Sequence, residues 1–341
     1  MKRIHSYSYI RTIACIGIIF IHVLTSGIAK YNFVNSDAAD VAYRSVVNCL
    51  KWGVPCFVMI SGMLLLNPQK EISVSYLFKR YVKRILLATI IFGLIFTILD
   101  FIFSGEFTVG NFLAGLYKIF SGGSWSHLWY LYCLIGLYLL LPFYKMITGC
   151  AKEQEIRYLL IVYVIFLSTI PLLNGFGIEC GFYIHVSSIY PFWFFYGYYM
   201  KQWGFKKSRT FYLGLAFFAT LILILLTVVR WSFEIDAMDS LFNYSSFIVI
   251  LQTTGVIGFL YKLKIKEGSR LDSVLLNIDK HSFGIYLMHM IAIWIAYTRI
   301  DWNPFLHGGF IGVIILAAVA FFSAYILDVL LKKISLFSKI L

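Results

Sequence analysis

Long apolar segments separated by short polar loops constrain the fold of this chain more than any other feature. A helix needs about 20 apolar residues to cross the hydrocarbon core of a bilayer. Ten segments approach that length: 9–29, 45–66, 84–103, 127–147, 157–173, 187–200, 210–230, 245–262, 282–299 and 308–330. Backbone polar groups in lipid must be satisfied within the segment, so each is expected to be helical. We therefore predict an all-α integral membrane protein with about ten transmembrane helices.

Composition agrees with this fold class. Apolar residues make up 60% of the 341 and charged residues only 13%, unlike soluble domains. No loop is long enough for a separate soluble domain, so residues 1–341 are predicted to form one polytopic membrane domain. The first apolar segment follows Lys2 and Arg3, as in a signal peptide, but its internal arginine and its length favour a first membrane span.

The distribution of positive charge predicts the orientation. Of the 29 lysines and arginines, 23 fall in one set of loops and at the two termini. The positive-inside rule then places both termini in the cytoplasm. Topology also accounts for the net charge of +13, so no nucleic-acid partner is predicted. The six cysteines lack CxxC or CxxH spacing, and neither a metal site nor a disulfide framework is indicated.

The first segment carries one arginine, Arg11, and one histidine, His22. Eleven residues at about 100° each bring both side chains to one helix face, with Cys15 and Ile18 between them. The rise of about 16 Å puts Arg11 at one membrane surface and His22 near the midplane. An ionisable group at that depth indicates a site, the alternative being a histidine that only packs against a neighbouring helix.

The ninth segment brings a second histidine to a similar depth. Ser282, Tyr286 and His289 stand at i, i+4 and i+7, and so form one polar stripe on an apolar helix. His289 enters from the cytoplasmic side by roughly 10 Å. We expect His289 and His22 to lie at comparable depths, which favours a site over packing alone.

Two further clusters stand at opposite ends of the third and fourth segments. Lys79, Arg80, Lys83 and Arg84 lie at the cytoplasmic mouth of the third segment. These four cations either only bias the membrane topology or also bind the phosphates of a cytosolic ligand, and the sequence favours neither interpretation. Outside, the fourth segment opens with Trp125, His127 and Trp129, which form an aromatic belt or hold a sugar ring.

Four motifs in this order resemble acyltransferase family 3, the multi-spanning O-acyltransferases that modify bacterial surface and secreted glycans. They are Arg11-x10-His22, Val54 to Leu64, His127 to Pro142 and Ser282 to His289. The resemblance extends from residue 9 to about residue 330. One departure concerns the family's basic Arg-x-x-Arg motif, because Lys83 stands at that spacing from Arg80 and Arg84 follows it.

The resemblance implies an enzyme of a bacterial inner membrane. It would take an acyl group from cytosolic acyl-CoA, with acetyl-CoA the expected co-substrate and no permanently bound cofactor. The acceptor would be a hydroxyl of an extracytoplasmic cell-surface glycan or its lipid-linked precursor. The sequence leaves the acceptor, the acyl group (acetyl or succinyl) and the oligomeric state open.

The same resemblance suggests roles for individual residues. His22 would act as general base or accept the acyl group, both of which need a neutral imidazole. Arg11 would assist from the cytoplasmic surface, and Tyr286 or His289 would orient His22 or polarise the thioester. The remaining candidates are Arg80, Lys83 and Arg84 for the CoA phosphates, and His127, Trp129 and Trp125 for the acceptor.

A glycan exporter or flippase without acyl transfer is the main alternative, because such a protein would also be basic, polytopic and aromatic at its interfaces. Coupled transporters carry chains of buried carboxylates. Here only Asp100 and Asp328 are expected near span ends, which argues against export. A sensory or amino-acid-handling membrane domain is a third possibility, although no fused domain is present to support it.

Overall fold

The computed structural model describes residues 4–31, 38–105, 107–182, 188–305 and 308–341. Throughout these ranges the regular structure is helical, and no strand occurs among them. Residues up to the middle of the chain form α1 (His5–Tyr31), α2 (Ala38–Cys49), α3 (Gly53–Leu65), α4 (Val74–Tyr76), η1 (Leu77–Val82), α5 (Lys83–Ser104), α6 (Val109–Ser121), η2 (Ser126–Leu128), α7 (Trp129–Leu139) and α8 (Leu141–Cys150). The rest form α9 (Glu153–Val164), η3 (Ile165–Thr169), α10 (Ile170–Gly175), α11 (Tyr190–Tyr199), η4 (Met200–Gly204), α12 (Arg209–Ser232), η5 (Asp236–Phe242), α13 (Phe247–Tyr261), α14 (Arg270–Thr298), α15 (Phe310–Leu331) and α16 (Ser335–Ser338).

The all-helical membrane fold is supported, but the count of ten spans is not confirmed. Seven helical stretches within the described ranges are long and apolar enough to cross a membrane. The helical stretch Val109–Leu139, which ends with α7, meets α8 at a bend of 53°, and the two together would make an eighth span. The predicted sixth span, whose first residue 187 lies outside the described residues, is the ten-residue α11 continued by η4. The predicted ninth lies within the 29-residue α14, whose polar residues lower its hydropathy.

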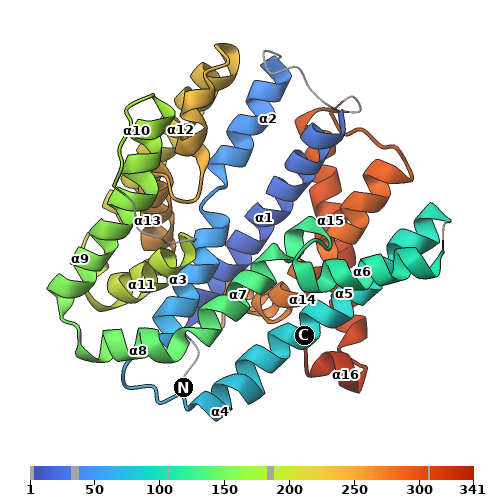
Figure 1. The fold of residues 1–341 in the computed structure, drawn as a ribbon, viewed down its shortest axis with the longest axis horizontal. Coiled ribbons are helices and arrows are strands. Elements are labelled where there is room, and N and C mark those ends of the chain that lie inside the picture. The colour runs from blue at the N-terminus through green and yellow to red at the C-terminus, as the bar shows by residue number, and fades with distance from the viewer. Residues whose placement is uncertain (1–3, 32–37, 106, 183–187, 306–307) are drawn as a thin grey trace.

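Helix α1 lies in the middle of the bundle, between α3 and α14 (Figure 1). Most of its apolar side chains are buried, as expected for a helix enclosed by other helices. Hydrogen bonds join α1 to α14 in the same order along both helices: Tyr9 to Asp272, Arg11 to Asp279, His22 to His289, and Tyr297 to the carbonyl of Val23. The two helices are therefore parallel, and equal depth on one means equal depth on the other.

Glycine lets two helices touch backbone to backbone beside this pair. A Cβ on Gly62 of α3 would lie 1.9 Å from the carbonyl oxygen of Phe194 in α11. Reciprocally, a Cβ on Gly197 would lie 2.1 Å from the carbonyl oxygen of Met59. Small residues at such crossings are a general device of membrane helix packing, and here they fix α11 against α3.

The cationic loops gather at one end of the bundle. Lys145 donates to the carbonyl of Asn67 (2.7 Å), and Lys201 donates to the carbonyl of Met63 (2.9 Å). In Figure 1 the start of α1 and the short helix α16 lie on the same side of the bundle as α4. This arrangement agrees with the predicted charge segregation. The cytoplasmic position of the termini stays a prediction, and Lys2 and Arg3 lie outside the described residues.

Candidate active site

The contact between α1 and α14 has two polar layers. Near the start of α1, the guanidinium of Arg11 donates two hydrogen bonds to the carboxylate of Asp279, from Nε at 2.6 Å and from Nη2 at 2.9 Å. About three turns further along, Nδ1 of His22 lies 2.6 Å from Nε2 of His289. The two histidines expected at comparable depths thus lie side by side in the fold, in direct contact. We call His22 and His289 the histidine pair.

Hydrogen-bond partners determine which nitrogen of the histidine pair carries each proton. Nδ1 of His289 faces the carbonyls of Tyr286 (2.7 Å) and Ile285 (3.2 Å), which can only accept. That nitrogen must therefore be protonated, and Nε2 of neutral His289 must accept from Nδ1–H of His22. The chain of donors ends at Nε2 of His22, which keeps its lone pair and has no hydrogen bond with a described residue.

A third histidine completes the group. His127 is 1% exposed, and its ring centroid lies 5.5 Å from that of His289 and 6.4 Å from that of His22. Its Nε2 donates to the carbonyl of Leu287 (3.1 Å), so Nδ1 carries a lone pair. That lone pair has no partner among the described residues. Two imidazole acceptors therefore lie within one small region.

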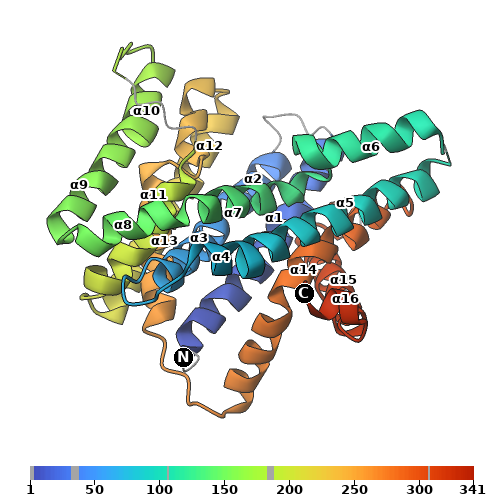
Figure 2. The ribbon, with the colours of Figure 1, turned by 60° about the horizontal axis from the view of Figure 1, so that its bottom comes forward.

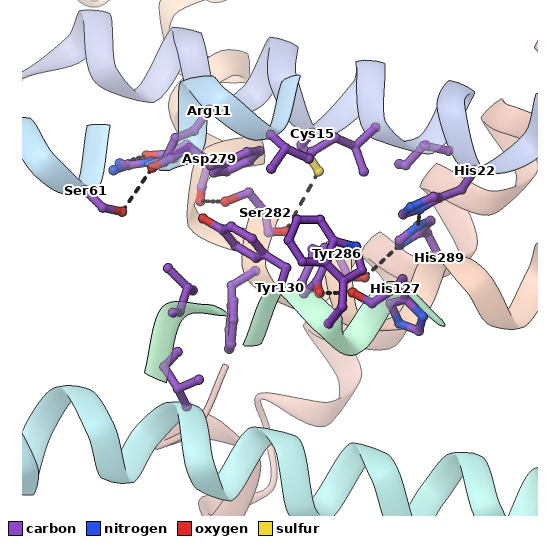
Figure 3. A pocket seen from close by; sticks show the side chains of 18 of the residues that line it. Arg11, Cys15, His22, Ser61, His127, Tyr130, Asp279, Ser282, Tyr286 and His289 are labelled. Atoms are coloured by element: carbon purple, nitrogen blue, oxygen red, sulfur yellow. Dashed lines mark hydrogen bonds and ion pairs between the residues drawn. The ribbon is translucent and has the colours of Figure 1, made fainter. Parts of the chain in front are cut away.

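One cavity of about 430 Å³ joins these features (Figure 3). We call it the histidine cavity. One end is lined by Arg11, Arg84, Asp279, Lys280 and Leu341, and the other end by His22, His289, His127, Trp129 and Tyr244. Apolar side chains such as Phe57 and Leu134 form much of the wall between. The cavity thus runs from a charged end to an uncharged aromatic end.

Asp279 was missed by the sequence analysis, although a signal for it exists. It stands ten residues before His289, much as Arg11 stands eleven before His22. On two parallel helices those spacings place the ion pair and the histidine pair on one common face. The aspartate is buried, whereas about a quarter of the Arg11 side chain (27%) is exposed.

The expectation that Asp100 and Asp328 are the only carboxylates near the spans is wrong. Asp40, Asp272 and Asp279 are also buried. Buried carboxylates pair with cations or hydroxyls, namely Asp40 with Arg44, Asp272 with His5 and Tyr9, Asp279 with Arg11, and Asp328 with His281 and Lys332. Pairing offsets the cost of burying each charge. These aspartates are structural ion pairs, and they form no continuous chain along the cavity.

Tyr286 is placed differently from its predicted role. Its hydroxyl donates to the backbone carbonyl of His127. The phenol therefore holds the turn that carries His127, and its proton is already engaged in that hydrogen bond. Trp129 lines the histidine cavity, packing near Tyr190 and Tyr244. Trp125 lines a separate groove, together with Asp100 and Trp294.

The predicted phosphate-binding cations divide between two cavities. Lys79, Arg80 and Lys83 line a second cavity of about 850 Å³, which we call the basic cavity. Arg84 and Leu341 line both this cavity and the histidine cavity, so the two adjoin there. Arg84 also donates to the carbonyls of Ile340 (2.7 Å) and Leu341 (2.8 Å).

A family model described as an acyltransferase domain matches residues 4–329, nearly the whole chain. The chain belongs to acyltransferase family 3. This membership confirms the resemblance drawn from the four motifs. Each motif of this family member contributes to the wall of the histidine cavity, through Arg11 and His22, Val54, His127 and His289.

Curated relatives of this acyltransferase family 3 member carry a name that refers to export. They are probable poly-beta-1,6-N-acetyl-D-glucosamine export proteins of Staphylococcus aureus. The protein of strain Mu50 is 26% identical over 334 residues, covering 88% of this chain and 86% of the relative. That of strain MSSA476 is 26% identical over 332 residues with the same coverage. No solved structure matches the chain significantly.

Proposed function

We propose that this membrane protein transfers an acyl group, with acetyl the expected one, from cytosolic acyl-CoA to a hydroxyl of an extracytoplasmic glycan. The observation that carries the proposal is the lone pair on Nε2 of His22, held at the cavity by the hydrogen-bond chain through His289. A base or nucleophile needs that orientation and that free nitrogen. A histidine that only packs needs neither.

The basic cavity is the proposed site of the donor's phosphates. Lys79, Arg80 and Lys83 line it and are exposed, so they are available to a cytosolic anion. Lysine offers point charges and arginine a planar fork, and both suit phosphate. Because the basic cavity adjoins the histidine cavity at Arg84, the donor's thioester arm would pass that residue toward His22.

The proposed reaction is acyl transfer with His22 as general base. The acceptor hydroxyl attacks the thioester carbonyl as its proton moves to Nε2 of His22. The carbon–sulfur bond breaks, and the leaving CoA sulfur takes that proton back. The same nitrogen would form an acyl-imidazole in a two-step route. In both routes His289 holds His22 in the reactive tautomer.

The acceptor is proposed to enter at the aromatic end of the histidine cavity. Trp129 and Tyr244 provide apolar surface for the sugar ring, and His22 faces it with Nε2. A few polar groups on apolar walls are typical of small-ligand sites. The name of the relatives suggests N-acetylglucosamine polymers as the acceptor class.

Export without acyl transfer is the second candidate, and the name of the relatives favours it. Two observations support transfer instead. The chain carries an acyltransferase domain. The volume of the histidine cavity, about 430 Å³, lies in the range of small-molecule sites.

Reconstituted proteoliposomes separate the two candidates. Labelled acetyl-CoA is supplied on the proposed cytoplasmic face, and an N-acetylglucosamine oligosaccharide is supplied on the opposite face in one arm and on the cytoplasmic face in the other. The proposal expects O-linked label on the oligosaccharide in the first arm. Transport of the oligosaccharide in the second arm, without label in either, would support export and refute acyl transfer.

A further inference from the structure

A concave surface distinct from the histidine cavity and the basic cavity lies between the hairpin of α5 and α6 and the end of α14. It is on the proposed outer side of the molecule. We call this cavity of about 530 Å³ the outer groove. Its lining includes Asp100 from α5, Asn111 and Lys118 from α6, and Trp125 and Trp294. In Figure 2, α5 and α6 run side by side away from the bundle. A tight contact holds them, because a Cβ on Gly115 would lie 2.3 Å from Thr97.

Two tryptophans that line the outer groove, Trp125 and Trp294, each pack against a phenylalanine outside its lining. Trp125 stacks on Phe96 with centroids 4.3 Å apart and an interplanar angle of 8°. Trp294 lies 5.9 Å from Trp125 and 4.5 Å from Phe103. The guanidinium of Arg299 lies 5.6 Å from the Trp294 centroid. The two tryptophans are half-buried, so they are rigid and partly accessible.

Polar side chains line the outer groove beside these two tryptophans. Both oxygens of Asp100 accept from the indole Nε1 of Trp125, at 3.1 and 3.2 Å. A carboxylate has about four lone-pair sites, so Asp100 retains capacity for further donors. Asn111 and Lys118 approach from α6 and, like Asp100, are exposed. Aromatic surface with hydroxyl-binding groups around it is the chemistry that holds a pyranose ring.

The outer groove lies next to the histidines. The Trp125 ring is 6.3 Å from the His127 ring, and Phe96 is 5.3 Å from the same ring. His127 lines the histidine cavity on its other side. The outer groove and the histidine cavity therefore lie on two sides of His127, without a lining residue in common.

We propose that the outer groove binds the sugar units adjacent to the acylated one, so that the protein acts on a glycan chain in preference to a single sugar. This inference rests on the proposed function and adds a substrate class to it. Trp125 and Trp294 hold the pyranose faces, and Asp100, Asn111 and Lys118 bind hydroxyl or amide groups.

Direct binding tests the outer groove independently of catalysis. A linear N-acetylglucosamine pentasaccharide and the monosaccharide are titrated against wild type, Trp294→Ala and Asp100→Asn in nanodiscs. Loss of one aromatic contact or charge-assisted hydrogen bond should weaken pentasaccharide binding roughly five- to ten-fold. Binding of the monosaccharide should not change in either variant, because it can occupy the histidine cavity alone.

The control is Trp231→Ala, which removes an indole from α12, on the opposite side of the bundle from α6 (Figure 1). This variant should bind the pentasaccharide as wild type does. Asn111→Ala supplies an exposed substitution if Trp294→Ala does not fold. Equal pentasaccharide affinity in wild type and all groove variants would overturn the inference. Pentasaccharide binding that depends on the groove, with no label transferred in the proteoliposome assay, would refute acyl transfer and leave the groove intact.

Discussion

The ion pair of Arg11 and Asp279 and the histidine pair of His22 and His289 cross the same helix contact, yet they differ in what they leave available. The ion pair is closed, since two arginine N–H groups meet two carboxylate oxygens. The histidine pair is open at one end, because its donor chain stops at Nε2 of His22. Under the proposed function, the charged pair holds α1 on α14 and the two imidazoles carry out the chemistry.

His22→Ala should have the largest effect on activity. Loss of the general base is expected to lower acyl transfer by at least about 10²-fold. Thermal stability in detergent should fall only slightly, since His22 borders a cavity. Cys15→Ala removes a side chain from the same wall and is the matched control. If His22→Ala still transfers most of the label, His22 is not the general base, and the histidine pair is no more catalytic than the ion pair.

Arg11→Ala should act mainly on stability. It leaves the buried carboxylate of Asp279 without its bidentate cation, at a cost of about 3 kcal/mol, the lower end of the range because Arg11 is partly exposed. The double variant Arg11→Ala/Asp279→Ala should recover much of that loss, as measured by thermal unfolding. If the double variant is no more stable than Arg11→Ala, the loss of stability does not come from an unpaired Asp279, and the proposed structural role of the ion pair is wrong.

Neutralising the basic cavity should have a smaller effect, on the donor alone. Arg80→Gln together with Lys83→Gln removes two charge-assisted contacts and should raise the KM for acetyl-CoA about ten-fold. The kcat should hold, because the histidine pair is untouched. A reporter fused after Lys207 checks that the topology is retained. An unchanged KM in a correctly inserted protein would leave these cations as topology signals.

The comparable depth of His22 and His289 could be predicted from the sequence. Helical rise sets how deep each residue lies, and both helices were expected to enter the membrane from the same side. The helical class could also be predicted, since apolar length is a local property. The number of spans was less accessible: the break at Leu140 adjoins Pro142 in the first turn of α8, and α11 is only ten residues long. Asp279 was overlooked because it lies three residues before residue 282, where the apolar ninth segment was predicted to begin. The bonds of Arg84 to Ile340 and Leu341 depend on tertiary contact.

A double-mutant cycle on the histidine pair tests the central claim most directly. Label transfer from acetyl-CoA is compared among wild type, His22→Ala, His289→Ala and the double variant. If the two imidazoles act as one catalytic unit, the double variant should be no slower than the worse single variant by more than about three-fold. Effects that multiply, so that the double variant loses the product of both single losses, would contradict a shared hydrogen-bond chain ending at Nε2 of His22.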